Sequence, residues 1–338
     1  MKKITKISAF SPEMALKESL ILIFHERVEE MFKYYAELFN EENTEALHKM
    51  RVAARRLKGY LKVFRQIFPT SSFNNKYNKI RNFIKTLGFI RELDVSVEII
   101  EDYLLKNPYP NNKIILLYLS KLKNQKLMLR TSLSKNKKII NFINSKEEIH
   151  NFFEKSFNKK HKKRFIYFLP DKSFEENSLV ILPELFKKTL KIKSEVLYHP
   201  RKKAELHKFR IAAKPLRYVM ELYTDIFGED FNELINFFKI VVEKLGAIHD
   251  IDVLIPKMNE YLHEIRIYNK SVERKERIHT LPLLNFLKKF RDERRKQFEI
   301  ICGMLEKWNY ADFKDRIFDL VNTSINNKII SPPEIIST

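Results

Sequence analysis

Cysteine is almost absent from this chain of 338 residues, in which Cys302 stands alone. A single cysteine cannot form a disulfide within the chain or supply a cysteine-based metal site, so both kinds of framework are excluded. Such scarcity is typical of proteins that fold in a reducing compartment. We therefore expect an intracellular protein.

Glycine is also rare, with five residues in the whole chain, and runs of β-branched residues are few. Leucine, lysine, isoleucine, glutamate and phenylalanine instead follow one another over long stretches without turn signals, a pattern that favours helices. Apolar residues still make up 44% of the sequence, which indicates a globular protein with a substantial core. The sequence predicts an all-α fold.

Long apolar segments are missing as well. The stretch 1–17 has no apolar core of signal-peptide length, and the run LILIF at 20–24 is far shorter than the ~20 residues of a membrane-spanning helix. From these absences we expect a soluble, cytoplasmic protein.

Acidic residues are outnumbered, with 43 Asp and Glu against 64 Lys and Arg, and the formal net charge is +21. An excess of this size favours an anionic partner, whether nucleic acid, an anionic membrane surface or a phosphate polymer. A solvated, lysine-rich surface is the alternative explanation for the bulk of the charge. The places where the charge clusters are therefore more informative than its total.

The helical pattern and its breaks predict four helices, a connector, four further helices and a short appendix. The expected helices cover about 12–39, 44–68, 73–105 and 112–144, then resume near Pro183, after Pro200, over 229–268 with a kink at Pro256, and over 282–308. The predicted domains are a first four-helix module at 12–148, a basic connector at 149–181 containing KKHKKR, a second four-helix module at 182–310, and a tail at 311–338. Two antiparallel four-helix bundles related by internal duplication are the expected architecture.

One phrase occurs twice in the sequence. EALHKMRVAARRLKGYLKVFRQIF at 45–68 is matched by AELHKFRIAAKPLRYVMELYTDIF at 204–227, which lies 159 residues further along. Because successive helical residues turn by about 100°, five basic residues of the first copy share an arc of about 80°. These five are His48, Arg51, Arg55, Lys58 and Lys62.

The second copy places His207, Arg210, Lys214 and Arg217 at the first four of these positions, and Glu221 at the fifth. Each basic stripe borders an arc of apolar residues, so it is expected beside the core rather than on the outer surface. Two matching stripes on two similar modules predict that both face one shared polyanion.

A second block is repeated, with LGFIRELDV at 87–95 answered by LGAIHDIDV at 245–253. Glycine inside a helix costs about 1 kcal/mol relative to alanine, so Gly88 and Gly246 suggest close helix packing. The acidic residues of this block are expected to orient or partly neutralise basic neighbours: Glu92, Asp94, Asp250 and Asp252. A third and weaker repeat matches Lys123, Lys126 and Arg130 with Lys288, Arg291 and Arg295.

Taken together and in order, the segments HKMRVAARRLK, LGFIRELDV, HKFRIAAKPLRY and LGAIHDIDV resemble those of CHAD domains, the conserved-histidine α-helical domains. The resemblance covers about residues 12–310. It implies a pseudo-twofold pair of four-helix bundles around a basic cavity that binds inorganic polyphosphate, and association with polyphosphate granules. Pro215 and Glu221 depart from the basic pattern, as does the exchange of Arg91 for His249.

The resemblance transfers the binding role to eight positions, namely His48, Arg51, Arg55, Lys58, His207, Arg210, Lys214 and Arg217. Nearby basic residues complete the candidate set: Arg56, Lys62, Arg91, Lys123, Lys126, Arg130, Lys288, Arg291 and Arg295. No Glu-x-Glu-x-Lys signature of an associated triphosphate-tunnel enzyme is found, so we expect a stand-alone binding protein without a cofactor rather than an enzyme.

Three alternatives remain open at this stage. A nucleic-acid-binding protein fits the charge, although single-strand binders interleave aromatic residues with their cations and the stripes contain none. A metal-dependent phosphohydrolase is suggested by His249-Asp250 with His207 and Asp252, but the first copy has Arg91-Glu92 at the corresponding positions, and arginine does not ligate metals. Binding to a membrane surface through KKHKKR is the third, and a solvated connector is the simpler interpretation of that segment.

Overall fold

The computed structural model describes residues 11–39, 44–108, 112–157, 169–196, 199–307 and 309–330. Every named element in these ranges is helical, which confirms the predicted all-α class. The α-helices are α1 (Leu16–Phe32), α2 (Thr44–Val63), α3 (Thr70–Lys106), α4 (Lys113–Thr131), α5 (Lys137–Ile143), α6 (Lys146–Phe157), α7 (Phe174–Val196), α8 (Lys203–Leu222), α9 (Thr224–Ser271), α10 (Leu281–Glu306) and α11 (Tyr310–Ile330). None of them is long and apolar enough to cross a membrane over the residues that the structure describes.

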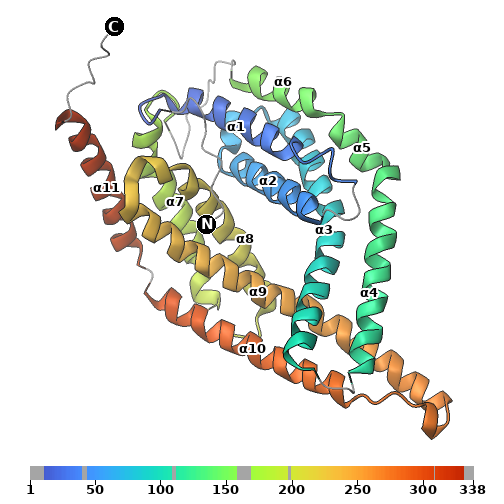
Figure 1. Ribbon diagram of the computed structural model, residues 1–338. Coiled ribbons are helices and arrows are strands. Elements are labelled where there is room, and N and C mark those ends of the chain that lie inside the picture. Colours follow the sequence, from blue (N-terminus) through green and yellow to red (C-terminus); the bar gives the residue numbers. More distant parts are fainter. Residues whose placement is uncertain are drawn as a thin grey trace.

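The helices pack in the same order in the two halves of the chain (Figure 1). In the first half α1 packs against α2 and α6, α2 against α3, and α3 against α4. In the second half α7 packs against α8 and α11, α8 against α9, and α9 against α10. The extensive contacts between the halves join α1 to α7, α2 to α8, α3 to α9 and α4 to α10.

The apolar core is continuous across the two halves. Its larger cluster contains Leu57 and Phe153 of the first half together with Phe186 and Phe209 of the second. A smaller cluster forms where the far ends of α3 and α4 meet those of α9 and α10, around residues such as Ile100 and Phe286. Figure 1 shows this junction, with the α3–α4 pair meeting the long α9–α10 pair. Two separate surfaces therefore hold the halves together.

Equivalent positions in the two halves touch directly at two places. Ala15 and Ser173 form an antiparallel bridge immediately before α1 and α7. On α2 and α8, a Cβ built at Gly59 would lie 3.0 Å from Cδ2 of Tyr218, so the small residue makes room for the ring. The hydroxyl of Tyr60 beside it donates to the carbonyl of Tyr218 at 3.2 Å. Gly59 and Tyr218 hold the same position in the two copies of the repeated phrase.

Several predicted helix limits were wrong. The first helix begins at Leu16 rather than at Pro12 and ends at Phe32 rather than Phe39. The segment 112–144, predicted as one helix, is broken after Thr131 by a 3-10 turn and resumes as α5. The side chain of Asn136 starts α5 by accepting hydrogen bonds from the backbone N–H groups of Lys138 and Ile139. A local capping residue thus outweighed the long periodic pattern.

The segment 149–181, predicted as an irregular connector, carries helical structure at both ends. α6 reaches Phe157 and buries Ile149, Phe152 and Phe153 at helical spacing, whereas the basic run at 159–164 lies outside the described residues. α7 begins at Phe174, where Ser173 and Glu176 exchange backbone and side-chain hydrogen bonds in a capping box. The motif Ser-x-x-Glu was present in the sequence and marks this helix start.

Two prolines lie inside helices, one of them at the point where the fifth predicted helix was expected to begin. Pro183 and Pro215 lie inside α7 and α8. In α9 the break occurs at Gly228, with φ of +72°, and the predicted kink at Pro256 is not where the backbone leaves the helical region. A positive φ is accessible to glycine at little cost, which explains why the break falls there.

Candidate functional site

The two basic stripes meet where α2 packs against α8. Six cations make up the central basic cluster, as we call it: Arg51, Arg55 and Lys58 of α2, and Arg210, Lys214 and Arg217 of α8. The packing of α2 on α8 around Gly59 and Tyr218 brings these two helix faces together. Residues far apart in the sequence therefore contribute to one site.

Lys214 lies at the middle of the cluster. Burial, followed by the charges of Arg210, Arg55, Arg51 and Arg217 in that order, lowers its pKa from 10.5 to about 6. Two of these arginines belong to α2 and two to α8, so guanidinium groups from both halves act on the same amine. No ion pair to Lys214 occurs within the described ranges. The site concentrates positive charge that the described residues neutralise only in part, through Glu221 beside Arg217.

Arg51 extends the cluster toward α3 and α9. Its pKa is lowered to about 9 by burial and by the charges of Arg55 and Arg91, against which Glu92 and Asp250 act. Its guanidinium passes over Gly88, where a built Cβ would lie 3.8 Å from Nη2. A Cβ at Gly88 would make only ordinary van der Waals contact with this cation. No atom lies within 4 Å of a Cβ built at Gly246, so the close packing expected there is wrong.

Arg210 is buried and contacts His207, whose ring stacks on a second histidine. Burial and the charge of Arg55 lower the pKa of Arg210. Its Nη2 lies 3.2 Å from Nδ1 of His207, and because arginine can only donate, this nitrogen accepts and the proton of neutral His207 is on Nε2. The ring of His207 stacks on that of His249 at 5.3 Å. Burial, followed by Arg210, His249 and Lys214, lowers the pKa of His207.

The α2 side of the cluster ends at Lys58. Burial lowers the pKa of Lys58, and so do the charges of Arg55, Lys62 and Arg81. Arg81 of α3 was not among the predicted residues, because it belongs to no repeated motif. Its place in the helix just before the repeated Leu-Gly block is the only sequence signal that could have found it.

Unsatisfied donors accompany this concentration of charge. The Nε atoms of Arg51, Arg210 and Arg217 are buried and have no hydrogen-bond acceptor among the described residues, and the same holds for Nε of Arg56 beside the cluster. Buried polar groups in folded proteins nearly always have partners, so each such atom calls for an explanation. An anion bound between the two stripes supplies one.

Arg56, although in the candidate set, is neutralised internally. Its guanidinium pairs with Glu30 at 3.3 Å and with Glu221 at 3.6 Å. Glu221 also pairs with Arg217 at 3.5 Å, and Glu30 pairs with buried Arg27. Glu221 replaces the fifth stripe cation, so this buried network closes one end of the basic row.

The acids of the repeated Leu-Gly block hold cations from the neighbouring helices, as predicted. Asp94 pairs with Lys126 of α4 at 2.7 Å. Asp252 accepts from Nε and Nη2 of Arg294 of α10 at 2.7 and 3.1 Å, and also pairs with Lys203 at 3.1 Å. The third repeat matched Lys126 with Arg291, but the cation of α10 that pairs with Asp252 is Arg294. The alignment of α4 with α10 is therefore shifted by about one helical turn from the predicted one.

The remaining candidates of the third repeat are engaged on α4 and α10. Lys123 pairs with Glu101 at 2.6 Å, and Arg295 with Asp292 at 3.0 Å. Nη2 of Arg291 lies 3.4 Å from Oδ1 of Asn259, and Arg130 is buried at the end of α4.

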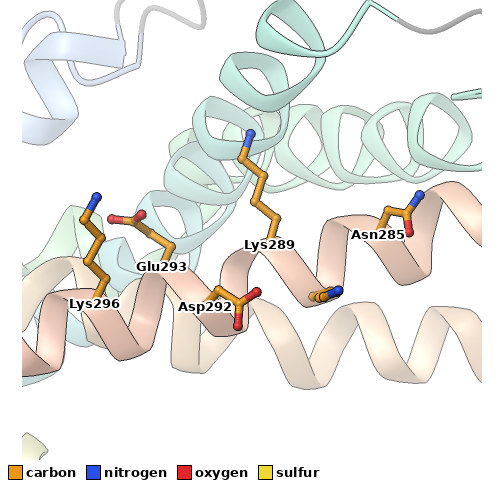
Figure 2. A pocket seen from close by; sticks show the side chains of 6 residues that line it. Asn285, Lys289, Asp292, Glu293 and Lys296 are labelled. Carbon is orange, nitrogen blue, oxygen red and sulfur yellow. The ribbon is translucent and has the colours of Figure 1, made fainter.

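Lys288 lines a surface pocket on α10. Lys289 and Lys296 line the same pocket, and Figure 2 shows them projecting to the same side. Glu293 lies between them, so acids interrupt this row of lysines.

Three further candidates lie at the margins of the central basic cluster. His48 is half-buried on α2 at the position equivalent to His207, and Lys62 is exposed at the far end of the stripe. Arg91 of α3 donates to Glu98 at 2.8 Å while its charge still acts on Arg51. The described residues contain no group of three or more His, Cys, Asp or Glu side chains placed to hold a metal ion.

Comparison with known proteins assigns the chain to a family. The CHAD domain family model matches residues 22–259. The crystal structure of the CHAD domain from the plant Ricinus communis is similar, with 18% identity, a TM-score of 0.65, and coverage of 90% of this chain and 96% of that one. PptA from Streptomyces chartreusis is 11% identical, with a TM-score of 0.60 over 87% of this chain and 99% of its own. No curated protein matches the sequence. The family model spans most of the chain and both structures share its fold, so the protein belongs to the CHAD domain family.

Proposed function

We propose that this protein binds inorganic polyphosphate at the central basic cluster, and that the cluster lies between two related helical bundles. The repeated packing order of α1–α4 with α6 and of α7–α10 with α11 supports the duplication. So do the direct contacts of Ala15 with Ser173 and of Gly59 with Tyr218, each joining equivalent positions. Contacts of this kind are expected next to a pseudo-twofold axis.

The observation that carries the proposal is the unbalanced charge around Lys214. Four arginines from two helices surround the half-buried Lys214, whose pKa has fallen to about 6. This arrangement does not stabilise the fold, because like charges in a partly buried site repel each other. A linear polyanion that lies along the two basic stripes of α2 and α8 would remove the repulsion and satisfy the buried Nε donors of Arg51, Arg210 and Arg217.

Polyphosphate fits the composition of the site. The polymer carries negative charge at every phosphate and has no bases, so it requires closely spaced donors and no stacking platform on the stripes. Arginine can donate two hydrogen bonds to one phosphate, and the cluster contains four arginines: Arg51, Arg55, Arg210 and Arg217. His207 can add a donor through its Nε2–H. Binding to polyphosphate granules would follow from the same interaction.

The test is calorimetric titration with polyphosphate of defined length at two salt concentrations. The double variant Arg51→Glu with Arg210→Glu should lose binding. The matched control is Lys49→Glu with Lys208→Glu, which makes the same charge change at exposed, equivalent positions on α2 and α8. Circular dichroism verifies that both variants keep their helices. Unaltered binding in the first variant, or an equal loss in both, would refute the site.

Nucleic acid is the competing ligand, because its phosphates could use the same cations. Competition of labelled polyphosphate by single-stranded oligonucleotides at fixed salt separates the two. We expect the oligonucleotide to compete more weakly per charge, since the central basic cluster has no row of aromatic side chains on which successive bases could stack. Equal affinity per charge would reassign the site to nucleic acid.

A further inference from the structure

A pocket of about 370 Å³ lies between α3 and α4, with one wall from α9. We call it the ring pocket. It is lined by Phe89, Glu92 and Leu93 of α3, Gln125, Met128 and Leu129 of α4, and Lys257 of α9.

The walls of the ring pocket are mostly apolar and unusually open to solvent. The side chains of Phe89 and Met128 are 54% and 71% exposed. Phenyl and thioether groups make favourable contacts with flat aromatic rings. Two polar groups, the amide of Gln125 and the carboxylate of Glu92, stand among them. A few polar groups on apolar walls are typical of small-molecule sites.

The ring pocket adjoins the part of α3 that Arg51 of the central basic cluster contacts. Phe89 follows Gly88, over which the guanidinium of Arg51 lies. Glu92 lines the pocket, and its charge acts on Arg51. Lys257 lies 3.9 Å from Glu92 and brings a further cation to the rim. A ligand held in the pocket therefore has positive charge next to it on the side of α2.

We propose that the ring pocket binds the base of a nucleoside polyphosphate whose phosphates lie on the central basic cluster. This inference rests on the proposed function and adds a second ligand class to it. The base stacks on Phe89 against Met128, and Gln125, which both donates and accepts, bonds to the edge of the base. Inorganic polyphosphate has no group that could use these walls.

The decisive comparison uses two ligands with the same number of phosphates, inorganic tripolyphosphate and adenosine triphosphate. Both are titrated without divalent metal, at one pH and one salt concentration. Charge alone favours tripolyphosphate, which carries more negative charge. Stacking of one base instead favours the nucleotide by about 5- to 150-fold. We expect the nucleotide to bind more tightly, and equal or weaker binding would overturn the inference.

Variants of Phe89 test whether the preference for the nucleotide depends on the ring pocket. Phe89→Ala should abolish the advantage of the nucleotide while changing the affinity for tripolyphosphate less than about 2-fold, and Phe89→Trp should retain it. Leu105→Ala is the matched control, because it removes an exposed apolar side chain from the C-terminal end of α3. A preference that survives Phe89→Ala places the base elsewhere and refutes the ring pocket.

The results also separate this inference from the proposed function. Binding of tripolyphosphate without nucleotide preference refutes the ring pocket and leaves the cluster intact. Nucleotide binding that depends on Phe89, without any binding of tripolyphosphate, would refute the central basic cluster as a polyphosphate site and leave the ring pocket as a site for the base. Self-association that is lost in Phe89→Ala, measured by sedimentation, would instead assign the pocket to a second copy of the chain.

Discussion

Lys214 gives a quantitative test of the electrostatics at the centre of the fold. Its pKa falls from 10.5 to about 6 because it is buried beside four arginines. At pH 7.5 the amine is therefore neutral in the folded chain and protonated in the unfolded chain, and loss of this proton on folding costs at most about 4 kcal/mol. Water near the amine and side-chain relaxation reduce that value. We expect Lys214→Met to raise the free energy of unfolding by ~1 to ~4 kcal/mol.

The direction of the pH dependence follows from the same shift. Between pH 6 and pH 10.5 the unfolded state binds more protons at Lys214 than the folded state does, so the wild-type protein becomes more stable as the pH rises. Below pH 6 both states are protonated and this dependence ends. Methionine does not titrate, so the stability advantage of Lys214→Met should shrink by up to about 2.7 kcal/mol between pH 6.5 and pH 8.5.

Urea unfolding at both pH values, followed by circular dichroism, measures these differences. Lys208→Met is the matched control, because Lys208 is exposed on the same helix and its replacement should change stability by less than ~0.5 kcal/mol. If Lys214→Met is less stable than the wild type, or if its advantage is the same at both pH values, then Lys214 is a charged and well-paired residue. The unbalanced cluster would then be refuted.

Three further outcomes are expected. Gly59→Val should lower the free energy of unfolding by ~1 to ~3 kcal/mol, because even a Cβ at this position lies 3.0 Å from the ring of Tyr218, and thermal unfolding would detect the loss. Glu221→Gln should destabilise the protein by ~3 kcal/mol in urea unfolding, since it leaves Arg56 and Arg217 without their shared buried carboxylate; an unchanged midpoint would contradict the network. The logarithm of the polyphosphate binding constant should fall linearly with the logarithm of salt concentration, with a slope near −4 if about six cations take part, and a flat dependence in the titration would rule out this electrostatic mode.

The helices were largely accessible to sequence analysis because their signals are local. The scarcity of glycine and the apolar periodicity predicted the helical class, and α2 and α3 end within a few residues of their expected limits. The errors arose where two local signals compete. Asn136 starts a new helix inside a periodic run, and Ser173 caps α7 well before Pro183.

The sequence by itself determined which cations share one face of a helix, because spacings of three and four residues fix their direction from the helix axis. It also identified the family, since the repeated phrases are carried by consecutive residues. Only the tertiary structure decided which of these cations remain without a counter-charge. Arg56 and Lys126 meet acids from other helices, whereas Lys214 meets four arginines, two of them from α2. Coulomb interactions depend on distance in space, and the distance between α2 and α8 is set by how Gly59 and Tyr218 pack.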